Sequence, residues 1–196
     1  FPSNLHRAAH SIPLIIWNGR DTKAGKRSNL MVSNMDIFST IIDVTNSVAN
    51  ESDQALPSRS LLPILNEFSD NWGEDAVYSE QEETRVVRTQ KYAYFRRFKM
   101  SQEFPFKDEL FDIENDPQEK NNLINEDKFS EVKCKLANML DSFFSIHSNL
   151  NSDLWNGGKA LQNSTRRKLW KDVWGEDWSP VYNFDKNRNF KNIDDK

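Results

Sequence analysis

The chain has 196 residues, with 26 lysines and arginines against 30 aspartates and glutamates, so its net charge is −4. Its longest apolar run, residues 12–17, is far shorter than the ~20 residues that a membrane-spanning helix needs. The charge balance is slightly acidic and no block of basic residues occurs, which disfavours nucleic acid as a partner. Composition therefore predicts neither a membrane-spanning nor a nucleic-acid-binding protein.

Cysteine, histidine and glycine are all scarce. Cys134 is the single cysteine and cannot form an internal disulfide, and with three histidines it cannot build a zinc site of familiar spacing. Six glycines are few for an α/β enzyme, which uses glycine where the backbone approaches phosphate or turns sharply. We therefore expect a fragment whose catalytic half lies upstream of Phe1.

The first third of the chain has the pattern of half an α/β unit. Residues 12–17 are short, β-branched and apolar, which predicts a buried strand, and the polar stretch 20–29 predicts a loop. Ser33 offers an N-cap to a helix that should bury one apolar stripe. That stripe consists of Ile37, Phe38, Ile41, Ile42, Val44 and Val48.

A change of pattern places a domain boundary near Asp70. Before it, residues 60–65 predict a short turn of helix broken by Pro63. After it come short runs of β-formers whose spacing predicts a small antiparallel meander. The predicted strands are residues 76–79, 84–89, 91–98 and 108–112.

A helix should close this sheet, because apolar residues recur at helical spacing along its stripe. The stripe consists of Phe129, Val132, Leu136, Met139, Leu140 and Phe143. From about Ser148 the chain becomes polar, yet it holds four of the six tryptophans, Trp155, Trp170, Trp174 and Trp178. Disordered tails lack aromatics, so we expect this part to lie on the folded body; stacking of the tryptophans on sugar rings is the alternative.

Arg96 and Arg97 are the candidate substrate-binding residues. Together with Lys99 and the neighbouring aromatic residues they form a basic-aromatic cluster. Charge-assisted hydrogen bonds from such a cluster could hold a sulfate or an anionic sugar. The alternative is that these side chains form the solvated face of a strand.

A calcium loop is one interpretation of Asp112, Glu114 and Asp116, which alternate as calcium ligands would. However, Pro117 and Leu123 stand where such a loop needs its glycine and its bidentate acid. The pattern is also that of a turn after a strand, and no metal ligand is predicted.

Three further motifs each have two interpretations. His6 and His10 are four residues apart, which suits a metal pair on a helix as well as two loop histidines. Residues 58–60, Ser-Arg-Ser, could be a nucleophile loop or an ordinary turn, and no activating histidine and acid are identified for them. Asn50 and Asn163 begin glycosylation sequons, which matter only in a eukaryotic secreted protein.

Several stretches, taken in their order along the chain, resemble the sulfatase family. They are residues 12–17, 23–25, 30–37, 40–44, 58–65, 76–80, 85–92, 109–117 and 119–123. The resemblance covers about residues 1–145. It implies an α/β fold in which the end of an alkaline-phosphatase-like catalytic domain, residues 1–70, precedes an antiparallel four-stranded sheet with a packing helix, residues 71–147. Residues 148–196 would form a tryptophan-containing tail.

The resemblance also implies hydrolysis of sulfate esters or sulfamates on a small molecule or glycan. The family uses a formylglycine and a calcium ion, and the residues for both would precede this chain. Cys134 lacks the Pro-Ser-Arg that follows the family nucleophile, so no catalytic residue is expected here. A noncatalytic remnant or interaction module, and a phosphatase or phosphonate hydrolase of the same superfamily, are the alternatives. A secreted, periplasmic or lysosomal location is implied.

One departure from the family concerns the first residues. Phe1-Pro2 and Asn4-Leu5 resemble a stretch of the heparan-type sulfatases in which a sulfate-binding lysine separates the two pairs. Only Ser3 stands between them here, and Arg7 is the nearest basic residue. No catalytic role is therefore assigned to this stretch.

Overall fold

A computed structural model describes residues 5–17, 25, 27–50, 55–67, 76–81, 84–97 and 107–148. The predicted boundary near Asp70, Lys99, the Asn163 sequon and the four tryptophans past Ser148 lie outside these residues. None of the described helices is both long enough and apolar enough to cross a membrane.

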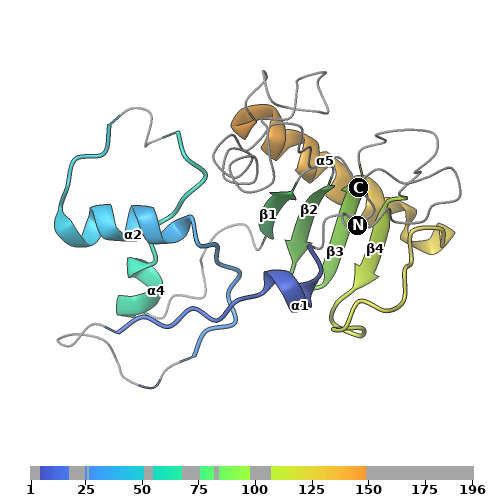
Figure 1. The fold of residues 1–196 in the computed structure, drawn as a ribbon, viewed down its shortest axis with the longest axis horizontal. Helices are drawn as coiled ribbons and strands as arrows, with labels where there is room; N and C mark the ends of the chain where they lie inside the picture. The colour runs from blue at the N-terminus through green and yellow to red at the C-terminus, as the bar shows by residue number, and fades with distance from the viewer. Residues whose placement is uncertain are drawn as a thin grey trace, which may run out of the picture.

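The best-packed part of the chain is the predicted meander. Its four antiparallel strands follow one another in sheet order, β1 to β4, as they do in sequence (Figure 1). The strands are β1 Ala76–Gln81, β2 Thr84–Thr89, β3 Tyr92–Arg97 and β4 Glu109–Asp112. The prediction of an antiparallel four-stranded sheet is confirmed, with strand ends shifted by one or two residues.

Helix α5, Ser130–His147, covers one face of this sheet, as its apolar stripe predicted. It follows the short 3₁₀ helix η1, Asp127–Phe129. Tyr94 and Leu110 lie opposite each other in the strand register, and both face Leu136, Leu140 and Phe144 of α5. Alternation along the strands sends the neighbouring side chains to the far face of the sheet.

The remaining described elements are three short helices. They are α1 Arg7–His10, α2 Asp36–Thr45 and α4 Leu62–Glu67. Figure 1 shows α1 in front of the sheet and α2 with α4 to its left, beyond β1. Pro63 lies in the first turn of α4, where a missing N–H disrupts nothing, so the prediction that it breaks the helix is wrong.

The prediction of a buried strand over residues 12–17 is also wrong in this structure. The segment has no strand assignment, and Ile12, Ile15 and Trp17 are 71 %, 88 % and 85 % exposed. A strand forms only where another strand accepts its backbone hydrogen bonds, and the described residues place none beside this segment.

The helix predicted from Ser33 begins later and turns a different face inward. Ser33 is not its N-cap, because α2 begins at Asp36 and ends at Thr45, before Val48. Asp36 and Thr40 are its buried residues, and they accept hydrogen bonds from the backbone N–H groups of Arg59 and Leu61 at 2.9 and 2.8 Å. The apolar stripe that should have been buried is largely exposed. Its exposed members are Ile37, Phe38, Ile41, Val44 and Val48.

Candidate functional site

The far face of the sheet, opposite α5, holds a buried cluster of charged and aromatic side chains. Arg88 projects from β2, and Phe95 and Phe111 project beside it from β3 and β4. The Arg88 guanidinium lies 5.3 Å from the centre of the Phe95 ring, which suits a cation–π contact. Strand alternation brings this arginine to an apolar surface, so it needs a counter-charge.

Glu119 provides that counter-charge from the loop after β4. Its side chain is 1 % exposed and accepts a hydrogen bond from Nη1 of Arg88, whose own side chain is 7 % exposed. The backbone of Glu119 is left-handed, at φ 55°, a conformation that residues other than glycine rarely adopt. The fold therefore holds Glu119 in an unfavourable backbone conformation, from which its carboxylate reaches Arg88 on the far face of the sheet.

The same carboxylate fastens the N-terminal segment to the sheet. Glu119 Oε2 accepts hydrogen bonds from His6 Nδ1 at 2.8 Å and from the Arg7 backbone N–H at 3.0 Å. Arg88 Nη2 donates to the Leu5 carbonyl at 2.6 Å. The His6 ring lies on Phe95, with centroids 4.7 Å apart. Residues 5–7 are thus joined to a loop more than a hundred positions away.

Two ionisable groups near this cluster have shifted pKa values. Burial alone would raise the pKa of the Glu119 carboxyl, but hydrogen bonds from Arg88 and the Arg7 amide outweigh it, so the pKa lies below its ordinary value. Burial lowers the pKa of His10, and the charge of Arg88 lowers it further. His10 Nε2 lies 2.5 Å from Ser79 Oγ in β1, a second link between the N-terminal segment and the sheet.

This cluster fastens segments together rather than performing chemistry. Glu119 is ionised at neutral pH and its two oxygens already accept three hydrogen bonds, so it is unsuited to general acid catalysis. Sequence reasoning missed the cluster, since Arg88 and Glu119 are 31 positions apart and in no motif. The one signal was a lone charged residue, Arg88, on the apolar face of a predicted strand.

The structure places Arg96 and Arg97 on opposite faces of β3. Arg96 faces α5, where Nη1 pairs with Asp141 and the side chain is 21 % exposed. Arg97 is on the far face with a side chain 5 % exposed, and donates to Thr84 Oγ1 at 2.7 Å and Glu109 Oε2 at 2.5 Å. The two arginines are therefore not brought together into one anion site, and substrate binding by either stays a prediction.

The other candidates have local structural partners. Asp112 accepts hydrogen bonds from Asn115, and Asp116 accepts them from the backbone N–H groups of Lys120 and Asn121 at 2.8 and 2.7 Å. Both acids thus stabilise the turn after β4. Ser58 Oγ bonds to the Met35 carbonyl at 2.7 Å, which ties residues 58–60 to the start of α2.

The histidine pair separates, because His6 contacts Glu119 while His10 contacts Ser79. Cys134 is exposed on α5. Among the described residues, no group of three or more His, Cys, Asp or Glu side chains could hold a metal ion. The described residues therefore do not fit the calcium ion that the resemblance implies.

The amino-acid sequence matches a known protein family. The family described as N-sulphoglucosamine sulphohydrolase, C-terminal, matches residues 4–145. The chain belongs to this family. The predicted resemblance to the C-terminal portion of a sulfatase is confirmed.

Solved structures with similarity to this sulfatase C-terminal region include three of different kinds. A putative sulfatase from Bacteroides thetaiotaomicron is 24 % identical with a TM-score of 0.45, over 56 % of this chain and 24 % of that chain. A protein solved with its substrate D-glucosamine-2-N,6-O-disulfate is 20 % identical with a TM-score of 0.46, over 56 % and 23 %. The phosphonate monoester hydrolase of Agrobacterium radiobacter is 20 % identical with a TM-score of 0.46, over 63 % and 27 %.

The sulfatase C-terminal region spans about a quarter of the length of these solved structures. No curated protein matches it. The similarity to these structures therefore does not extend to the other three quarters of their chains.

Proposed function

We propose that this chain is the C-terminal portion of a sulfatase-type hydrolase that acts on a sulfated sugar or other sulfated small molecule. The observation that carries the proposal is the family match over residues 4–145, nearly all of the described chain. The chain's contribution is structural: it completes the catalytic domain's packing and provides one wall of the substrate cleft. The nucleophile and the calcium ligands belong to the upstream portion. The whole protein acts in an extracytoplasmic compartment.

The exposed apolar surface of the first 50 residues supports the proposal that this chain packs against an upstream catalytic portion. Ile15 and Trp17 in the extended segment, and Ile41 and Val44 on α2, are each more than half exposed. The sheet with α5, by contrast, buries its apolar residues in two complete clusters. An apolar surface of this kind normally marks an interaction site, and the upstream catalytic portion is the partner we propose.

A comparison of two proteins tests the proposed activity. The 196-residue chain should give no turnover of an aryl sulfate or of glucosamine N-sulfate with calcium, whereas the protein expressed together with its upstream coding region should hydrolyse one of them. Sulfate release, measured by ion chromatography, is the readout. Turnover by the chain alone would overturn the division of labour. No turnover by the longer protein would favour the noncatalytic remnant, and preference for a phosphonate ester would favour the other superfamily activity.

Arg96 is the better candidate of the two for contact with substrate, because its side chain is 21 % exposed against 5 % for Arg97. In the longer protein, Arg96→Gln would raise KM if Arg96 binds the leaving group. Arg97 already donates to Thr84 and Glu109, so its substitution would act mainly on stability.

The exposed apolar surface has a measurable consequence for the chain by itself. We expect the 196-residue chain to bind a hydrophobic dye and to self-associate, because Ile12 and Ile15 are 71 % and 88 % exposed. Dye fluorescence and sedimentation at several concentrations measure both effects. The longer protein is the control and should bind less dye. A monomer that melts sharply and binds no dye would contradict the proposed docking surface.

A further inference from the structure

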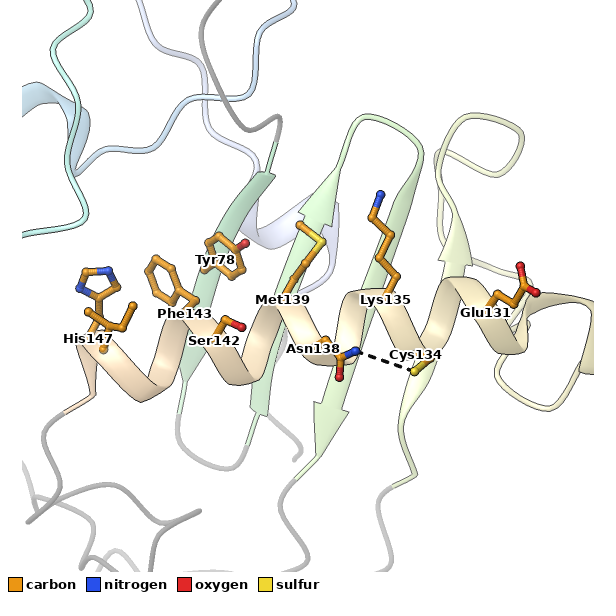
Figure 2. Close-up of a pocket in the computed structure, with 10 residues that line it drawn as sticks. Tyr78, Glu131, Cys134, Lys135, Asn138, Met139, Ser142, Phe143 and His147 are labelled. Atoms are coloured by element: carbon orange, nitrogen blue, oxygen red, sulfur yellow. Dashed lines mark hydrogen bonds between the residues drawn. The ribbon is translucent and has the colours of Figure 1, made fainter.

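A groove of about 750 Å³ runs along the side of α5 that meets β1 (Figure 2). Tyr78 of β1 and Met139, Phe143 and Ile146 of α5 supply its apolar surface, called here the α5 shelf. The Tyr78 and Phe143 rings stack, with centroids 4.0 Å apart at 8°. Ile146 is 74 % exposed, whereas Tyr78, Met139 and Phe143 are partly buried against the core that α5 makes with the sheet, so the shelf forms the outer edge of that core.

We propose that residues 149–178 of this same chain dock on the α5 shelf through their tryptophans. The position of the chain supports this occupant. Helix α5 ends at His147, and the backbone N–H of Ser148 donates to the Phe144 carbonyl at 3.1 Å, so the chain leaves the helix at the end of the groove that Ile146 and His147 line. The next residues of the polypeptide therefore start at the shelf.

Chain length allows contact with every part of the α5 shelf. From His147 back to Glu131 the whole groove extends over about 24 Å of helix at 1.5 Å per residue, and the helical residues of the shelf, from Ile146 to Met139, lie in its nearer half. Trp155 follows Ser148 by seven residues, which span up to about 23 Å when extended. Trp155 can thus reach any part of the α5 shelf, and the later tryptophans have more length available.

Composition and spacing favour an apolar surface as the destination of this segment. Leu169, Trp170, Val173 and Trp174 recur at the spacing that places side chains on one side of a helix. A stripe of this kind needs another apolar surface to cover it. The α5 shelf is within reach, and the contact requires no sulfatase activity.

The single cysteine gives a direct test, because Cys134 is exposed and lines the groove. A bimane fluorophore on Cys134 is quenched by a tryptophan that touches it. We expect brighter emission when Trp155, Trp170, Trp174 and Trp178 are all changed to Phe, which keeps apolar rings but removes the quenchers. Unchanged emission would overturn the proposal. A difference in emission between the unchanged chain and the four-Trp→Phe chain that grows with protein concentration would also overturn it, since the tryptophans of a second copy would then be the occupant.

A matched pair of variants separates docking from chance encounters. Ile146→Asp places a charge on the shelf and should weaken docking by about tenfold or more, so emission rises. Ser145→Asp adds the same charge at an adjacent exposed position that does not line the groove, and should change nothing. Equal effects of the two variants would contradict specific docking. In the four-Trp→Phe background, Ile146→Asp should have no further effect.

A second readout removes the bulk of the label. Iodoacetamide should alkylate unlabelled Cys134 faster in the Ile146→Asp chain than in the unchanged chain or the Ser145→Asp chain, because the docked segment shields the thiol. Equal alkylation rates in all three chains would count against docking.

Discussion

Glu119→Gln should lower the free energy of unfolding by about 3 kcal/mol, because removal of one partner leaves the Arg88 charge buried without a counter-charge. The side chains of Arg88 and Glu119 are 7 % and 1 % exposed, so water cannot replace the lost carboxylate. Among the described residues, the buried Nε of Arg88 has no hydrogen-bond partner. No second acceptor among these residues is therefore in place there to compensate for the loss of the Glu119 carboxylate. Urea denaturation followed by circular dichroism measures the change.

The same pair gives a pH dependence with a defined sign. The pKa of Glu119 in the folded chain lies below its ordinary value of 4.5. Its contribution to stability is therefore fully present above pH 4.5 and is lost as the pH falls through the folded pKa, where the carboxylate takes up a proton. The free energy of unfolding of the unchanged chain should therefore fall in acid by the contribution of the ionised Glu119. The Glu119→Gln chain should not show this part of the decrease.

Glu126→Gln is the matched control for the buried pair. Its partner, Lys128, lies 2.8 Å away, but the two side chains are 44 % and 70 % exposed. Exposed ion pairs contribute about 0–1 kcal/mol, so this variant should unfold nearly as the unchanged chain does. Equal losses for Glu119→Gln and Glu126→Gln would show that burial of the first pair is unimportant. Arg88→Met with Glu119→Gln should recover part of the loss, since no unpaired charge then remains.

Phe95→Ala should lower the free energy of unfolding by about 3–5 kcal/mol, the range for a buried aromatic side chain reduced to alanine. Phe95 is completely buried on the far face. The centre of its ring lies 4.7 Å from the centre of the His6 ring and 5.6 Å from that of the Phe111 ring. Its removal would leave a cavity beneath the N-terminal segment. Chemical denaturation measures the loss, and hydrogen exchange should show earlier opening of residues 5–10 than of α5.

Ile15→Ala is the control for this second substitution. Ile15 is 88 % exposed, so truncating it should change stability by no more than about 0.5 kcal/mol. In the longer protein we expect a larger loss from the same substitution, because the upstream portion would cover Ile15. A large loss in the 196-residue chain itself would mean that residues 12–17 are buried there. An effect of Phe95→Ala as small as that of Ile15→Ala would contradict the far-face core.

Local patterns were sufficient for the sheet and its helix. Val86 and Val87 point to opposite faces, and each face finds a cover, α5 on one and the N-terminal segment on the other. The predicted helix stripe at Leu136 and Leu140 faces the sheet as expected, because period and partner are both contained in residues 76–148. The order of motifs along the chain was also sufficient to indicate the sulfatase family.

Prediction failed where a segment depends on something outside its own pattern. Residues 12–17 have the composition of a buried strand, yet backbone pairing requires a neighbouring strand, and the described residues supply none. Helix α2 turned Asp36 and Thr40 inward because the backbone of residues 59–61 offered them hydrogen bonds, while much of its apolar side stays exposed among the residues that the structure describes.

The meander, the covering helix and the family all follow from the amino-acid sequence, since each rests on spacing within a short stretch or on the order of such stretches. The folded arrangement was needed to establish that Glu119 pairs with Arg88 and holds residues 5–7, and that Arg96 and Arg97 serve different faces. An ion pair across 31 positions leaves no periodic trace along the chain. Its formation depends on a left-handed residue in a loop, and only the folded chain around it holds that conformation.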